Sequence, residues 1–172
     1  MQDDIIFSVS VPATSANVGV GYDCLGLAFN LRAHFTFREA DELEIDGCPS
    51  RFQNDDNLVW QAYCTACDKL GDEPTPKHIT IDSPIPFSGG LGSSSTCVIA
   101  GVACALQESH SGWDPERALD LACRIEGHPD NIYVGFSRVV VLKMRTGVEG
   151  LEEFFLCFEA VLLFRSQFFF LF

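Results

Sequence analysis

The sequence predicts an α+β domain, and three observations support this class. Apolar and polar residues alternate over residues 5–11 and 28–38, which is the period of a half-buried strand. Apolar residues recur at helical spacing between residues 58 and 70 and again after residue 114. Strands and helices do not alternate strictly and no repeat is visible, so the pattern is less typical of a doubly wound sheet.

Strands are predicted in four places. The strand at 5–11 leads into a loop of small residues at 12–22, and the second strand follows at 28–38. Leu43 and Ile45 indicate a short third strand, and residues 78–82 indicate the fourth.

Helices are predicted in three places. The first begins after Asn57 and ends at Gly71. The second is the apolar run that follows the glycine-rich segment 86–96. The third begins at Asp114, where an N-cap acceptor precedes a proline, and it ends at Gly127.

The glycine-rich segment 86–96, PFSGGLGSSST, carries the strongest chemical signal. Three glycines within four positions let the backbone approach a ligand closely, and the following helix start offers unpaired N–H groups to an anion. The segment lacks the Gly-Lys-Ser/Thr of a Walker A loop, and its GGxG spacing is not a dinucleotide-binding fingerprint. The alternative is a turn whose serines only cap the helix.

Two further segments concentrate polar groups. Residues 12–26, PATSANVGVGYDCLG, place Asn17 and Asp23 where they could bind a polar substrate, or where they only make local turn bonds. Residues 126–131, EGHPDN, combine carboxylates and an imidazole that would suit a metal-phosphate site. The alternative for this segment is an ordinary helix end capped by Gly127 and stopped by Pro129.

In this order the three segments resemble the motifs of the GHMP kinase family, over residues 5–131, and within it they are most similar to the homoserine kinase branch. The resemblance implies a ribosomal protein S5 domain 2-like N-terminal domain with a left-handed β-α-β unit. It also implies ATP bound at the glycine-rich segment, with Mg²⁺ held by Ser94 and Glu126. The residues expected to contact ATP are Pro86, Ser88, Gly89, Gly90, Leu91, Gly92, Ser93, Ser94, Ser95 and Thr96.

The resemblance implies transfer of the γ-phosphoryl group of ATP to the side-chain hydroxyl of L-homoserine, giving O-phospho-L-homoserine for threonine biosynthesis. Asn17, Asp23, His128 and Asn131 would face the amino acid. Phosphoryl transfer depends mainly on positioning and charge stabilisation. Catalysis by alignment, with Asn131 at the hydroxyl, is therefore favoured over a mechanism in which Asp130 acts as the base.

The family pattern stops near residue 135. Residues 1–134 carry a net charge of −13, whereas residues 135–172 carry none and hold 9 of the 15 phenylalanines. We therefore predict an ATP-binding domain at 1–134 and a divergent tail at 135–172, truncated or frame-shifted, with the family's C-terminal ferredoxin-like domain absent or vestigial.

Composition limits the other function classes. The net charge of −13 disfavours nucleic acid and anionic membranes as partners, and no basic-then-apolar leader is visible, so a cytoplasmic protein is expected. The alternatives are a GHMP kinase acting on mevalonate or a sugar, an inactive nucleotide-binding fragment, and a zinc module built on Cys64 and Cys67. A homodimer is the assembly to test.

Overall fold

A computed structural model describes most of the chain up to residue 142. The described residues are 5–16, 26–110, 113–127, 129–136, 140–142 and 153–154. The predicted site residues Asn17, Asp23 and His128 lie outside these ranges.

The described strands form one sheet in the order β3-β4-β2-β1-β5-β6. Their bounds are β1 Ile5–Ala16, β2 Gly26–Glu39, β3 Glu44–Asp46, β4 Lys77–Asp82, β5 Val140–Leu142 and β6 Glu153–Phe154. β3 and β4 pair in parallel, and the chain between them passes through a helix, which makes a β-α-β unit. The other neighbouring strands pair antiparallel.

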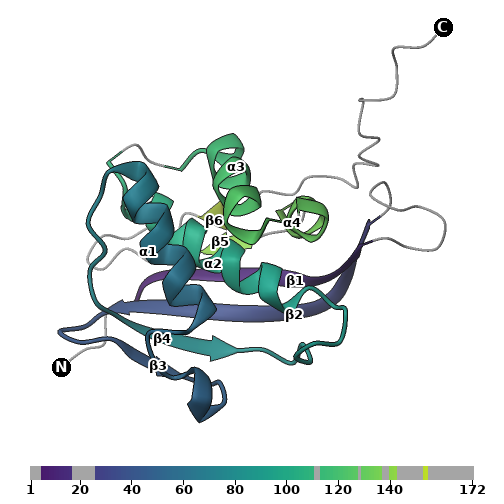
Figure 1. The fold of residues 1–172 in the computed structure, drawn as a ribbon, viewed down its shortest axis with the longest axis horizontal. Coiled ribbons are helices and arrows are strands. Elements are labelled where there is room, and N and C mark those ends of the chain that lie inside the picture. The colour runs from purple at the N-terminus through teal and green to yellow at the C-terminus, as the bar shows by residue number, and fades with distance from the viewer. Residues whose placement is uncertain are drawn as a thin grey trace, which may run out of the picture.

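Four helices cover one side of this sheet (Figure 1). They are α1 Leu58–Leu70, α2 Ser93–Glu108, α3 Pro115–Glu126 and α4 Pro129–Phe136, with a 3-10 turn at Ser50–Phe52. The α+β class predicted from the sequence is confirmed. No helix in the described ranges is both long and apolar enough to span a membrane.

Helix α2 lies at the centre of the core. Its residues from Ser95 to Leu106 are buried except Cys97, which is half-buried. It packs closely on α1, because a Cβ atom added to Gly101 would come 2.4 Å from the carbonyl oxygen of Val59. This packing fixes where the first turn of α2, and hence the glycine-rich segment before it, stands relative to the sheet.

Strand β1 is longer than predicted, so the loop predicted from residue 12 was wrong at its start. Pairing with β2 continues through Thr14, Ser15 and Ala16, after a register shift between Pro12 and Thr14. Proline lacks the N–H that a ladder needs and is tolerated where pairing is irregular. Because β1 extends this far, Thr14 lies beside the glycine-rich segment and Asn131.

Helix α4 was not predicted, because Pro129 was considered only as a possible helix stop. In the structure Pro129 is the first residue of α4, a position that suits proline because its missing N–H would be unpaired there. The helix continues to Phe136, so the boundary predicted after residue 134 falls inside it. The division into two regions stays a prediction.

Candidate active site

The glycine-rich segment makes a tight turn before α2. Ser88, Gly90 and Gly92 all have positive φ angles, of 59°, 69° and 66°. Gly92 is the N-cap of α2, and no side chain among the described residues caps this helix start. The first N–H groups of α2 are therefore directed toward the turn, together with the positive end of the helix dipole. This arrangement suits an anion such as a phosphate.

The four hydroxyl residues after Gly92 have different surroundings. The side chain of Ser94 is exposed and that of Ser93 is half-buried. Ser95 and Thr96 are each 2% exposed, and Thr96 Oγ1 donates to the carbonyl oxygen of Ser93 at 2.8 Å. Ser93 and Ser94 can therefore offer hydroxyls to a ligand, whereas Ser95 and Thr96 hold the first turn of the helix in place.

Glu126, the last residue of α3, lies against this helix start. Ser94 Oγ donates to both of its carboxylate oxygens, at 2.9 and 3.1 Å, and Ser95 Oγ donates to Oε1 at 3.1 Å. The two predicted metal ligands, Ser94 and Glu126, are thus brought together across 32 residues of sequence. Hard oxygen donors of this kind suit Mg²⁺, which takes one or two carboxylates along with substrate phosphate oxygens. The described ranges contain no cluster of three or more His, Cys, Asp or Glu side chains that could hold a metal ion.

Thr14, near the end of β1, joins all three predicted segments. Its N–H donates to the carbonyl oxygen of Leu91 at 3.0 Å, and its hydroxyl donates to Asn131 Oδ1 at 3.1 Å. Thr14 itself is 1% exposed. No role was predicted for Thr14 from the sequence. A threonine that continues the strand pattern but is followed by a small-residue loop gives no local sign of such distant partners.

Asp130 and Asn131, the two predicted catalytic residues, lie in the first turn of α4. Both are half-buried. The bond from Thr14 places Asn131 beside the glycine-rich segment, since Thr14 also bonds Leu91. Asn17, Asp23 and His128 lie outside the described residues.

A cavity of about 260 Å³ adjoins the glycine-rich segment and was not predicted. The rings of Phe52 and Phe87 line this cavity, and their centroids lie 5.6 Å apart. Asn57 also lines it, but both ends of its amide are used, by Val59 N–H and by the carbonyl of Phe52. Burial raises the pKa of the Cys97 thiol to about 12, so this thiol stays protonated, while Arg51 and Asp56 bring charged groups to the lining. The cavity suits a flat, largely apolar group attached to phosphates.

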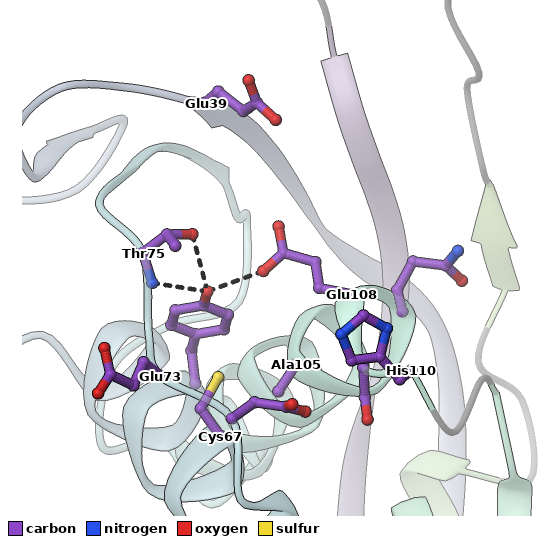
Figure 2. A pocket seen from close by; sticks show the side chains of 11 residues that line it. Glu39, Cys67, Glu73, Thr75, Ala105, Glu108 and His110 are labelled. Carbon is purple, nitrogen blue, oxygen red and sulfur yellow. Dashed lines mark hydrogen bonds between the residues drawn. The ribbon is translucent and has the colours of Figure 1, made fainter.

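A second cavity, of about 510 Å³, lies at the other end of α2 and contains none of the predicted site residues. Figure 2 shows Thr75 and Glu108 with dashed hydrogen bonds that converge on one hydroxyl. This is the hydroxyl of Tyr63, which donates to Glu108 Oε2 at 2.7 Å and accepts from Thr75 N–H at 3.2 Å. Buried Lys77 forms an ion pair with Glu108 Oε1 at 2.9 Å. Burial raises the pKa of Tyr63, which keeps its hydroxyl protonated. These contacts connect α1, α2 and β4.

Known proteins share the sequence pattern and the fold of this chain. The family model of the GHMP kinases N terminal domain matches residues 57–137. Homoserine kinases of Clostridium botulinum (strain 657 / Type Ba4) and Clostridium beijerinckii are 46% and 43% identical over 129 residues, which is 74% of this chain and 43% of each relative. The chain therefore spans less than half the length of these curated relatives.

Solved structures give the same result. A homoserine kinase structure from Cytophaga hutchinsonii superposes with a TM-score of 0.64 at 26% identity, covering 84% of this chain and 50% of that one. A mevalonate kinase structure from Methanococcus jannaschii superposes with a TM-score of 0.59 at 18% identity, covering 83% and 54%, and this likeness concerns the fold alone.

Proposed function

The chain carries the N-terminal domain of the GHMP kinase family, and from this premise we propose that it is the ATP-binding part of a homoserine kinase. The observation that carries the proposal is the Ser94–Glu126 contact at the start of α2. It brings a hydroxyl and a carboxylate to a helix start that is open to phosphate. The likeness to homoserine kinases at 46% identity supports this branch over mevalonate or sugar kinases.

ATP would bind with its phosphates over residues 86–96 and its base in the cavity beside them. The N–H groups of α2 would bind phosphate oxygens, and Ser93 and Ser94 would add hydroxyl donors. The rings of Phe52 and Phe87 offer the base an apolar surface. Ser94 and Glu126 would hold Mg²⁺, which supplies positive charge to the phosphate oxygens when bound.

Homoserine would lie between the first and third segments. Asp23 would bind its ammonium group, while Asn17, His128 and Asn131 would bind its other polar groups. The hydroxyl oxygen forms a bond to the γ-phosphorus, the bond from that phosphorus to the β,γ-bridging oxygen breaks, and ADP leaves. We favour catalysis by alignment, with the hydroxyl proton passing to solvent, over proton transfer to Asp130.

The product, O-phospho-L-homoserine, would feed threonine biosynthesis in the cytoplasm, and a homodimer remains an assembly to test. An ADP-release assay with homoserine, mevalonate and galactose, in the presence of Mg²⁺ and ATP, tests the proposal on this chain. We expect ADP release with homoserine alone. Release with mevalonate or galactose but not with homoserine would contradict the substrate assignment. Calorimetry with MgATP separates a chain that binds nucleotide without turnover from one that binds none.

A further inference from the structure

Thr14 is buried at the point where the three segments of the site meet. It is 1% exposed, so it does not touch a ligand itself. Its N–H is bonded to the glycine-rich segment at Leu91, and its hydroxyl is bonded to the side chain of Asn131, 117 residues away. Any effect of Thr14 on the reaction must therefore act through these two partners.

The hydroxyl of Thr14 lies against the carbonyl end of the Asn131 amide. It donates its proton to Asn131 Oδ1 at 3.1 Å. With the carbonyl toward Thr14, the –NH₂ group, which donates two hydrogen bonds and accepts none, is the end of the amide that remains to face a ligand.

A glycine leaves room for the hydroxyl of this side chain. A Cβ atom at Gly92 would lie 2.1 Å from Thr14 Oγ1, so only glycine allows the hydroxyl to stand there. The close approach of the Gly92 backbone and the bond to Asn131 both act on this hydroxyl.

We propose that Thr14 is a positioning residue that holds the Asn131 amide with its N–H donors toward the reacting oxygens. The inference rests on the proposed function, and it specifies the role of Asn131. The amide donates to an oxygen of the substrate hydroxyl or of the phosphoryl group, and it cannot accept the hydroxyl proton. Thr14 thus favours catalysis by alignment, because the group nearest the hydroxyl is held as a donor.

The test begins with the Asn131 side-chain amide in the ¹⁵N-labelled chain, with its resonances identified by their loss in Asn131→Asp. Thr14→Val keeps the shape of the side chain and removes the donor, so the amide resonances should shift. Thr14→Ser keeps the donor and should leave them near their wild-type positions. Thr14→Ala lacks the donor without adding bulk and serves if Thr14→Val does not fold. Unchanged Asn131 resonances in the variants without the hydroxyl would overturn the inference.

Kinetics supply the second readout. With homoserine and MgATP, Thr14→Val should lower kcat by roughly tenfold, the value of one hydrogen bond, while changing KM for ATP by less than about twofold. In an Asn131→Ala background the same change should cost nothing further. An equal loss in both backgrounds would show that Thr14 acts elsewhere and would overturn the inference. If the wild type releases no ADP with any substrate, the proposed function fails, and the amide resonances still decide the role of Thr14.

Discussion

The hydroxyl oxygen of Ser94 lies 2.9 Å from Oε1 of Glu126, although one residue lies in the first turn of α2 and the other ends α3. Ser95 donates to the same carboxylate oxygen from within the helix. The carboxylate therefore rests against the positive end of α2, where a negative charge is stabilised. When phosphates and a cation are bound, Ser95 can remain hydrogen-bonded to Glu126 while the Ser94 hydroxyl rotates toward the ligand.

Replacement of Glu126 tests this arrangement directly. In Glu126→Gln we expect the affinity for MgATP to fall by roughly tenfold to a hundredfold, the range of about 1.5–3 kcal/mol for a contact with a charged group. The affinity for ATP in the presence of EDTA should change little, because the carboxylate is required for the cation. Calorimetric titrations with and without Mg²⁺ measure both. Glu116→Gln, an equal charge change in the first turn of the same helix, is the matched control. Equal losses with and without Mg²⁺ would refute the metal role.

Two glycines of the loop offer a second, closely matched pair of variants. Both Gly90 and Gly92 have positive φ, but a Cβ atom at Gly90 would meet nothing within 4 Å, whereas one at Gly92 would lie 2.1 Å from Thr14 Oγ1. Gly90→Ala should therefore cost only backbone strain, about 1 kcal/mol of unfolding free energy. Gly92→Ala should cost at least about 2 kcal/mol and should also weaken MgATP binding. Urea unfolding and nucleotide titration compare the two. A loss in Gly90→Ala equal to that in Gly92→Ala would contradict the contact with Thr14.

Local patterns predicted most of the fold. Alternation located β1 and β2, and the caps Asn57 and Asp114 located the starts of α1 and α3, because each signal is short-range and is decided by neighbouring residues. Helix α4 was missed, since Pro129 can either stop a helix or begin one, and only the packing of α4 on β1 distinguishes the two.

The site was partly predictable for a different reason. The pairing of Ser94 with Glu126 followed from the family resemblance and not from the spacing of 32 residues, which no local rule can interpret. The hydrogen bond between Thr14 and Asn131 and the cavity lined by Phe52 and Phe87 were not predicted, because each depends on tertiary contacts between segments far apart in sequence.

The cavity beside the loop leads to a prediction about the base of the nucleotide. Phe87 is 55% exposed, so replacing it should cost little stability while removing an aromatic surface. In Phe87→Ser we expect ATP to bind more weakly by about 1–3 kcal/mol, the range for stacking of a base on an aromatic ring. Magnesium tripolyphosphate, which has no base, should bind as before. Phe29→Ser, at another exposed aromatic outside the cavity, is the control for loss of surface hydrophobicity. Equal weakening of both ligands would argue against a base site here.

The ion pair between Lys77 and Glu108 predicts a stability effect remote from the loop. Lys77 is 2% exposed and Glu108 is 26% exposed, so Glu108→Gln leaves a buried ammonium without its countercharge. We expect a loss of about 3 kcal/mol in unfolding free energy, the lower end for a buried pair because Glu108 is partly solvated. Asp120→Asn, which removes the exposed pair with Arg124, should cost much less, because solvent screens that pair. Urea unfolding of the two variants measures the difference. Similar losses would mean that burial does not set the strength of the Lys77 pair.

Cys67 predicts how stability changes in alkaline solution. Burial raises the pKa of its thiol to about 11 from 9.0, while the neighbouring Tyr63 side chain opposes the shift and the charge of Glu108 adds to it. Between these pH values the unfolded chain has released the thiol proton and the folded chain has not, so the unfolded state binds fewer protons. The free energy of unfolding must then fall as pH rises through this window, by up to about 1.4 kcal/mol per pH unit for one thiol.

In Cys67→Ala the slope of unfolding free energy between about pH 9 and about pH 11 should be smaller, and other thiols with raised pKa, such as Cys104, should account for part of what remains. The slopes of the two proteins are compared, and not their absolute stabilities, because replacing the Cys67 side chain by alanine also removes packing in the core. An unchanged slope would show that Cys67 ionises in the folded chain as readily as in the unfolded one.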